Sequence, residues 1–370
     1  MATESRRRIL QVHGASASAA DELMAYNCSN FTLQSLPTKY PLPDEAFVGT
    51  WAAYEQEAAP GEVFSFLCQK LVQFRFPIME GIRSTADYRL ATARGILPED
   101  GHGLALVIER PEELRLEIHQ TPAGRIPILF TPNRRDFVSL VHALTMRNEP
   151  GLVPDSMGAC LVSGYNNWDR VRTYRAKWAE TLGHEPSDEE WGMEFQSFAR
   201  QKDFYQDKFI LLSGGCYSAV SADAIGLDAD TWRALSIVIR REHECAHYFT
   251  RRVLSSTRNN LLDELIADYC GIIAAAGEYR ADWARRFLGL EDFPTYRAGA
   301  RLENYRGKTP LSDEAFHVLQ SLVNSAIESL RAYWQRQAAF GLPHAVIGLS
   351  RLTLEELASE DILATKTEDE

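Results

Sequence analysis

A segment from Thr231 to Val253 contains neither glycine nor proline, and it constrains the fold more than any other part of the sequence. Asp228 and Asp230 precede it, and aspartate is a favoured N-cap residue because its side chain accepts a backbone N–H. Arg251 and Arg252 stand near its end, where the helix dipole favours cations. The segment therefore predicts a long α-helix, and its largely apolar first half predicts that this helix is buried.

The second half of the predicted helix contains the motif H-E-x-x-H, formed by His243, Glu244 and His247 with two intervening residues. Residues four apart lie one turn apart on the same face of a helix. Two imidazoles at this spacing can reach one metal ion. The glutamate between them is then placed beside the open coordination position.

A second helix is predicted from Leu261 to Ala276, with Asn259 or Asn260 as its cap. Helices joined by a short connection usually pack antiparallel, which would carry Glu264 back toward the histidines. Asp268 follows Glu264 by four residues and shares its helical face. We therefore expect Glu264 to be a third metal ligand, and Asp268 to accept the free N–H of a ligand histidine.

The combination of H-E-x-x-H in 243–247 and E-x-x-A-D in 264–268 resembles the gluzincin class of zinc metallopeptidases, which has a thermolysin-like architecture. It is also similar to compact domains of the ImmA/IrrE type and to membrane M48 peptidases. The resemblance is limited to residues 209–276. It implies one zinc ion per chain, with these roles for the residues of the site: His243, His247 and Glu264 as ligands, Glu244 as general base and Asp268 as the partner of a ligand histidine.

Two imidazoles and one carboxylate leave zinc a net positive charge and an open position, where the pKa of bound water falls to ~7. Glu244 can accept a proton as water attacks a carbonyl, and pass it to the leaving nitrogen. We therefore expect a zinc-dependent hydrolase that acts on an amide or peptide bond. A further donor would stabilise the oxyanion, and the sequence offers these candidates: Tyr248, Tyr269, Arg301, Tyr305 and His317.

Tyr305 and His317 are the two additional catalytic candidates that we retain. Tyr305 lies in a loop-like stretch, 304–308. His317 falls on the polar side of a helix predicted from Ser312 to Ala339, a face that usually meets only water.

Two other functional classes remain open. One is a metalloenzyme that modifies a small molecule or peptide by other chemistry. The other is a binding or regulatory protein with a structural metal site. An intact Glu244 disfavours the second class, because a closed structural site does not need a base.

The predicted fold class is α+β, with an α+β N-terminal domain in residues 1–150 and a mainly helical metallopeptidase-like domain in 151–370. A short strand at 208–213 either forms a sheet edge that binds extended substrate or is an ordinary strand followed by a hairpin through 217–220. The N-terminal domain has no assigned role. Its predicted elements are helices at 44–57, 62–74 and 136–146, and strands at 104–109, 114–118 and 126–130.

Composition excludes several partners. A net charge of −12 argues against general binding to nucleic acids or anionic membranes. No apolar run is long enough for a secretory signal or a membrane span. The 6 cysteines are scattered, so reduced thiols and a cytoplasmic location are expected. The sequence indicates neither an oligomeric state nor a specific substrate.

Overall fold

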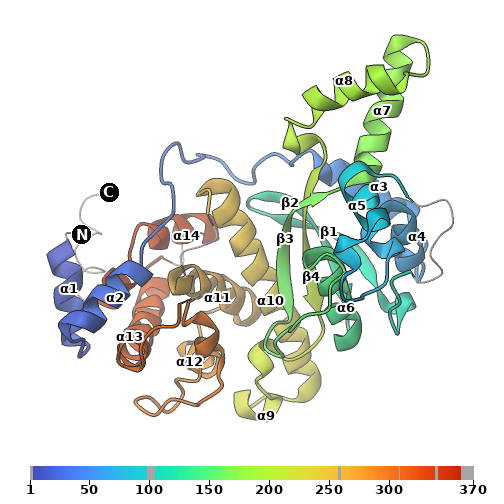
Figure 1. The fold of residues 1–370 in the computed structure, drawn as a ribbon. Helices are drawn as coiled ribbons and strands as arrows, with labels where there is room; N and C mark the ends of the chain where they lie inside the picture. The colour runs from blue at the N-terminus through green and yellow to red at the C-terminus, as the bar shows by residue number, and fades with distance from the viewer. Residues whose placement is uncertain (1–2, 98–104, 257–259, 308, 338–340, 360–370) are drawn as a thin grey trace. The chain divides into compact units, whose positions relative to one another are not determined.

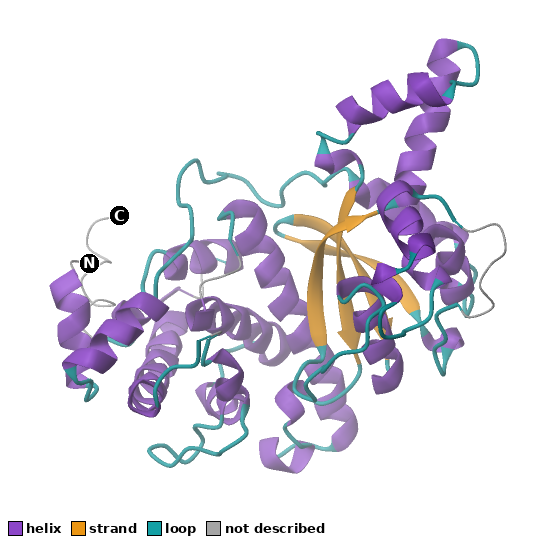
Figure 2. Cartoon of the chain, viewed as in Figure 1, coloured by secondary structure: helices purple, strands orange, loops and turns teal. Residues whose placement is uncertain are grey.

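The computed structural model describes residues 3–97, 105–256, 260–307, 309–337 and 341–359. These residues form many helices and a four-stranded sheet (Figure 2), which confirms the expected α+β class. The chain divides into two compact units. We call residues 41–215 the sheet unit, and residues 1–40 together with 216–370 the helical unit.

The sheet has the strand order β1-β2-β4-β3, with β1 at Arg115–Thr121, β2 at Gly124–Thr131, β3 at Ala159–Asn166 and β4 at Gln206–Ser213. The pairs β1/β2 and β3/β4 are antiparallel, whereas β2/β4 is parallel. The sheet unit also contains these α-helices: α3 (Phe47–Glu57), α4 (Val63–Lys70), α5 (Ala86–Arg94), α6 (Arg134–Thr145), α7 (Trp168–Leu182) and α8 (Asp188–Phe198). Its short 3-10 helices are η1 (Val72–Arg75), η2 (Ile82–Ser84), η3 (Pro111–Glu113) and η4 (Lys202–Phe204).

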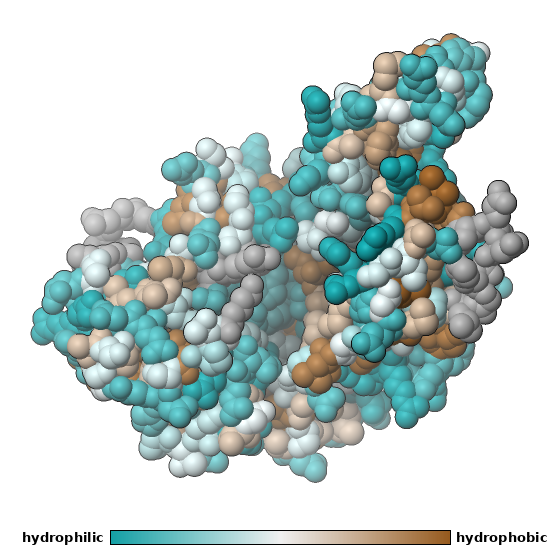
Figure 3. All heavy atoms as spheres, viewed as in Figure 1, coloured by the Kyte–Doolittle hydropathy of each residue, from teal (hydrophilic) through white to brown (hydrophobic). Residues whose placement is uncertain are grey.

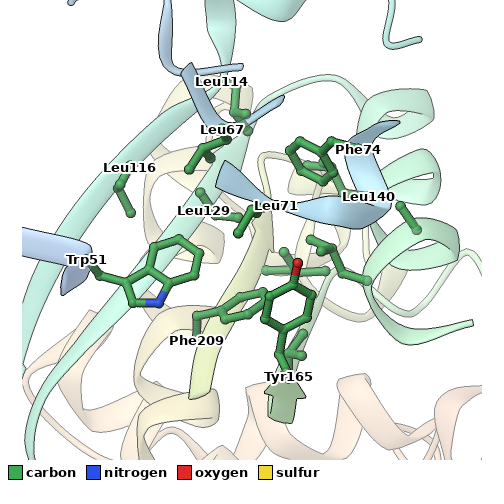
Figure 4. Close-up of a cluster of buried hydrophobic side chains, with 14 of the residues drawn as sticks. Trp51, Leu67, Leu71, Phe74, Leu114, Leu116, Leu129, Leu140, Tyr165 and Phe209 are labelled. Carbon is green, nitrogen blue, oxygen red and sulfur yellow. The ribbon is translucent and has the colours of Figure 1, made fainter. Parts of the chain in front are cut away.

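The core of the sheet unit lies between one face of the sheet and helices α3, α4 and α6 (Figure 4). Alternate residues of a strand face the same side, and Phe209 and Leu211 of β4 both point into this core. The ring of Phe209 packs against Trp51 of α3, with 4.9 Å between ring centroids, and against Tyr165 of β3. This packing holds β4 against α3 and β3.

A buried polar network also holds β4 to the helices. Asp207 is fully buried and accepts hydrogen bonds from Trp51 Nε1 at 2.8 Å and Asn167 Nδ2 at 2.7 Å. Arg170 of α7 forms an ion pair with the same carboxylate at 2.5 Å. Burial raises the pKa of Asp207 to about 6 despite the opposing pull of Arg170, Asn167 and Trp51.

The helical unit consists of the following elements: α1 (Thr3–Val12), α2 (Ala17–Tyr26), η5 (Tyr217–Ala219), α9 (Ala222–Ile225), α10 (Ala229–Val253), α11 (Asn260–Ala276), α12 (Ala281–Leu288), η6 (Arg301–Tyr305), α13 (Asp313–Gln337), α14 (Leu342–Ser350) and α15 (Leu354–Leu357). Helix α13 buries Leu319, Val323 and Ile327 completely and packs against α2, α12 and α15. The helices α10 and α11 make the most extensive helix pair of the unit (Figure 1).

The helices predicted around the metal motifs are confirmed. Helix α10 spans the predicted segment, and Asp228 caps it by accepting the N–H of Thr231 at 2.9 Å. Helix α11 covers the second predicted segment, although Asn259 lies outside the described residues. Gly271 of α11 lies directly against α10, where an added Cβ would come within 2.6 Å of the carbonyl oxygen of Ile239. The two helices can therefore approach closely.

The compact units differ from the predicted division at residue 150. Strands β1 and β2 come from the expected N-terminal domain, whereas β3 and β4 come from the expected C-terminal domain, yet all four form one sheet. Residues 1–40 cluster with the C-terminal helices. Pairing between strands far apart in sequence leaves no local pattern, so the boundary could not be predicted.

Three predictions of local structure are wrong in part. Strand β4 is paired on both sides, so it is not a sheet edge open to substrate. The predicted hairpin at 217–220 is replaced by the 3-10 helix η5. Residues 105–109 of the predicted strand at 104–109 are not a strand, and residue 104 lies outside the described residues. The apolar residues 106 and 108 instead pack into the core of the sheet unit without strand pairing.

In the described parts of the chain, no helix combines the length and apolar character needed to cross a bilayer. The face shown in Figure 3 is mostly hydrophilic or neutral. The most exposed large apolar residues are scattered through the sequence: Val12, Val107, Leu152 and Met193.

Candidate metal centre

The two histidines of the H-E-x-x-H motif lie one turn apart on α10 and are nearly buried. The His243 side chain is 9% exposed and the His247 side chain is 11% exposed. Their rings meet edge to face at 4.7 Å between centroids, and their Nε2 atoms are 3.1 Å apart. The helix thus directs one nitrogen of each ring to a common point.

Glu264 of α11 supplies a carboxylate at the same point. Its Oε2 is 3.4 Å from Nε2 of His243, and its Oε1 is 3.5 Å from Nε2 of His247. The antiparallel packing of α10 and α11 produces this arrangement, because His247 lies near the start of α11 and His243 lies one turn further along it. The structure therefore brings together the three residues predicted as ligands.

The spacing of the two Nε2 atoms and the Glu264 carboxylate fits zinc. For tetrahedral zinc with bonds of 2.0–2.1 Å, two ligand atoms should be roughly 3.3 Å apart. The two Nε2 atoms are 3.1 Å apart, and the carboxylate approaches them at 3.4 Å through Oε2 and at 3.5 Å through Oε1, distances close to this value. The donor set, two imidazoles and one carboxylate, is also one that zinc accepts in sites that keep a fourth position for water or substrate.

Both imidazoles are oriented by aspartates on α11. Nδ1 of His243 is 3.0 Å from Oδ1 of Asp268, and Nδ1 of His247 is 3.0 Å from Oδ2 of Asp263. A carboxylate at Nδ1 favours the tautomer that carries its proton there, which leaves the lone pair on Nε2. Two lone pairs 3.1 Å apart repel each other unless a proton or a metal cation lies between them.

Asp268 is in turn fixed by Tyr217 and Arg301. The hydroxyl of Tyr217 donates to Oδ1 of Asp268 at 2.6 Å and accepts from Nη1 of Arg301 at 2.8 Å. Arg301 also pairs directly with Oδ2 of the same carboxylate. Burial opposes the charge on Asp268, but Arg301 and the hydrogen bond from His243 outweigh it and keep the pKa of Asp268 below its usual value.

The position of Tyr217 follows from contacts between η5 and α10. Its backbone N–H donates to Oγ of Ser236 at 3.0 Å, and the carbonyl of Val220 accepts from Nε1 of Trp232 at 2.8 Å. Within η5, Ser218 has a left-handed φ of 51°, and its hydroxyl accepts a hydrogen bond from Arg301. Left-handed backbone at a non-glycine residue is strained, and the surrounding contacts hold it in place.

Tyr305 contacts the third ligand. Its hydroxyl donates to Oε2 of Glu264 at 2.7 Å. Burial and the negative charge of Glu264 both raise the pKa of Tyr305, so it remains a hydrogen-bond donor. Burial disfavours the charged form of Glu264, but the neighbouring imidazoles of His243 and His247 hold its pKa well below the usual range.

The charges of the site favour a bound cation. Three carboxylates, those of Asp263, Glu264 and Asp268, lie against the two imidazoles. Arg301 pairs with Asp268 and supplies one positive charge. With neutral imidazoles, these groups sum to −2, which is unfavourable in a buried site. Burial lowers the pKa of both histidines, yet the carboxylates outweigh it and raise the pKa of each. One divalent cation or two protons would restore neutrality.

Comparison with known proteins gives a family but no function. The model of the family of unknown function DUF7005 matches residues 8–361. The chain belongs to this family. No curated protein and no solved structure matches the chain.

The other predicted site residues of this DUF7005 chain have different environments. Glu244 is 7% exposed and lies on α10 between the two histidines. His317 is exposed on α13, outside the contacts of the cluster. Tyr248 and Tyr269 are fully buried, and both Nη atoms of Arg301 are engaged by Asp268 and its neighbours.

Two residues of the cluster had no role in the sequence-based prediction. Asp263 directly precedes Glu264, and its position near the start of the second helix could have suggested a partner for the second histidine. Tyr217 gives no such signal, because it reaches Asp268 through the fold of a short 3-10 segment far away in sequence.

Proposed function

We propose that this chain is a zinc-dependent hydrolase that cleaves an amide or peptide bond, with the helical unit as a gluzincin-like metallopeptidase domain. His243, His247 and Glu264 would hold one zinc ion. The observation that carries the proposal is the convergence of these three side chains. The two Nε2 atoms are 3.1 Å apart, and Oε2 and Oε1 of Glu264 lie 3.4 Å and 3.5 Å from the His243 and His247 nitrogens, close to the spacing of a tetrahedral zinc site.

The zinc ion, when bound, would supply a Lewis acid that lowers the pKa of water and polarises the substrate carbonyl. Glu244 would act as general base, because it directly follows the first ligand histidine in the H-E-x-x-H motif and is 7% exposed. It would take a proton from the attacking water and deliver it to the leaving nitrogen.

The remaining residues would keep the ligands in position. Asp268 and Asp263 would hold the histidine rings through their Nδ1 atoms, as carboxylates commonly do behind metal-binding histidines. Arg301 and Tyr217 would keep Asp268 ionised and oriented. The Tyr305 hydroxyl is close enough to Glu264 to hold its carboxylate. The substrate would be a peptide or another molecule with an amide bond.

The proposal is tested first by elemental analysis of protein purified without a histidine tag. We expect about one zinc per chain, lost in His243→Ala and in Glu264→Ala and retained in Glu244→Gln. A parent protein with substantially less zinc than one ion per chain would contradict the metal site.

Hydrolysis is then tested with a panel of fluorogenic peptides and small amides. Glu244→Gln should lower turnover by about 10²- to 10⁴-fold, the usual contribution of a general base. The matched control is Glu242→Gln, the same change two residues away, where Glu242 pairs with Arg241 at 2.8 Å. If parent and Glu244→Gln act equally on every substrate, the hydrolase assignment is wrong.

A further inference from the structure

The N-terminal arm, residues 3–32, belongs to the helical unit although more than two hundred residues separate it from the metal motifs. Leu10 of α1 and Leu23 of α2 are fully buried. Arg6 forms an ion pair with the buried Glu355 at 3.1 Å, and Asn27 donates to the same carboxylate at 2.9 Å. The arm is therefore an integral part of this unit.

The end of the arm contacts both helices of the candidate metal centre. The backbone N–H of Thr32 donates to the carbonyl of Leu254, directly after α10, at 2.9 Å. The carbonyl of Tyr26 accepts a hydrogen bond from the side chain of Asn260, the first residue of α11. Both contacts lie where the polypeptide leaves one ligand-bearing helix and enters the other.

Tyr26 also reaches the residue that holds the third ligand. Its hydroxyl donates to the backbone carbonyl of Tyr305 at 2.5 Å. The side chain of Tyr305 donates to Oε2 of Glu264 at 2.7 Å. A continuous chain of contacts thus runs from the N-terminal arm through Tyr305 to the carboxylate of Glu264.

We propose that Tyr26 is a positioning residue of the metal centre, which acts through Tyr305 to fix the carboxylate of Glu264. This inference rests on the proposed zinc site, but not on hydrolysis. A carboxylate can bind a metal through one oxygen or two, and it can rotate about its side-chain bonds. The hydrogen bond from Tyr305 to Oε2 restricts rotation of this carboxylate and so fixes how it faces the two histidines.

The hydroxyl of Tyr26 matters because it holds the end of η6. Residues 301–305 form this short segment, and its first residue, Arg301, is fixed by Asp268. Its last residue, Tyr305, is fixed at the backbone by Tyr26 and at the side chain by Glu264. Loss of the Tyr26 hydroxyl should therefore allow the Tyr305 side chain to shift relative to Glu264.

The test is a double-mutant cycle of zinc affinity with Tyr26→Phe and Tyr305→Phe. Partners behind metal ligands typically change metal affinity by roughly 10- to 100-fold, so we expect about a 10-fold loss in Tyr305→Phe. Tyr26 acts one step further away, and Tyr26→Phe should weaken binding by about 3-fold. In the Tyr305→Phe background the second substitution should have no further effect, because the path to Glu264 is already broken.

A matched control separates positioning from general stability. Tyr333 is also partly buried and donates to a backbone carbonyl, that of Ala345, at 3.3 Å. Tyr333→Phe should leave zinc affinity unchanged even if it lowers thermal stability. Zinc affinity is measured by competition with a chromophoric chelator. The visible spectrum of the cobalt(II)-substituted protein reports the ligand geometry independently of activity, and it should change in Tyr26→Phe and not in Tyr333→Phe.

The outcomes distinguish this inference from the proposed function. Equal zinc affinity and equal cobalt spectra in parent and Tyr26→Phe would overturn the role of Tyr26. Additive losses of affinity in the double variant would also overturn it, because Tyr26 would then act by another path. A parent that binds zinc and shows the non-additive pattern, but hydrolyses nothing, would support Tyr26 as a positioning residue and refute only the hydrolase assignment.

Discussion

Replacing each of the two aspartates that contact the histidines should separate the orientation of the ligand imidazoles from the stability of the fold. Asp268→Asn and Asp263→Asn are the same chemical change at two buried positions, each 1% exposed. Each aspartate faces Nδ1 of one histidine at 3.0 Å. They differ in that Asp268 also pairs with Arg301, whereas Asp263 has a weaker contact with the hydroxyl of Thr250 at 3.3 Å.

We expect similar losses of zinc affinity in the two variants. An amide can present its NH₂ group to the imidazole, which allows the ring to change tautomer or turn away. Such changes behind a metal ligand reduce affinity by roughly 10- to 100-fold, or about 1.4 to 2.7 kcal/mol of binding free energy.

The losses of folding stability should differ. Asp268→Asn leaves the guanidinium of Arg301, 8% exposed, without its carboxylate. Breaking a buried ion pair from one side costs about 3 kcal/mol at the lower end of the usual range. Arg301 keeps its hydrogen bonds to Tyr217 and Ser218, so the lower end applies. In Asp263→Asn, the hydrogen bond with His247 loses its charged acceptor, and the free energy of unfolding should fall by about 1 kcal/mol.

The assay has two parts. Zinc affinity is measured by chelator competition, and the free energy of unfolding is measured by urea titration after prolonged dialysis against chelator. Hydrogen exchange of amides in α10 and α11 assigns the change to the helical unit. The reasoning is refuted if Asp268→Asn binds zinc as tightly as the parent, or if both variants lose the same stability.

Three further predictions concern residues outside the ligand set. His317→Ala should change zinc affinity and turnover by less than about twofold, because the side chain is exposed; a large loss of turnover would restore His317 as a catalytic residue. Phe209→Ala should lower the free energy of unfolding of the sheet unit by about 3 to 5 kcal/mol, because the ring is fully buried against Trp51. Hydrogen exchange of the β4 amides measures this loss, and an unchanged exchange rate would contradict the packing. The pKa of Asp207 is raised from 3.8 to about 6 in the folded protein, so its contribution to stability is present below pH 4 and is lost as the pH rises through 6. Asp207→Asn should remove this part of the pH dependence, about 1 to 3 kcal/mol between pH 4 and 7 in urea titrations, and an identical pH profile in both proteins would contradict it.

The local elements around the site could be predicted because they depend on patterns within one helix. The Asp228 cap, the uninterrupted segment to Val253 and the apolar row of the next helix predict α10 and α11 closely. Elements whose partners lie far away in sequence could not be predicted in this way. Strand β4 was read correctly as a strand, but its interior position depends on pairing with β2 and β3.

Residues that orient the ligands also came from distant segments. Tyr217, Arg301 and Tyr305 enter the site from two short 3-10 helices, which have no periodic signature. Arg301 was a candidate for stabilising an oxyanion, yet its Nη atoms are engaged by Asp268, Tyr217 and Ser218. The residue type of Arg301 indicated a place near the site, but its role depends on the carboxylate with which it pairs, Asp268.

The sequence by itself determined that His243 and His247 share one helical face, because the spacing of four residues matches one helical turn. It also determined that Glu264 and Asp268 share a face of the following helix. Only the tertiary structure decided that these two faces meet, with donor atoms 3.1–3.5 Å apart, and that Asp263, Tyr217, Arg301 and Tyr305 surround them. The physical reason is that periodicity within a helix is local, whereas the position of one helix against another depends on close packing such as that of Gly271 on Ile239.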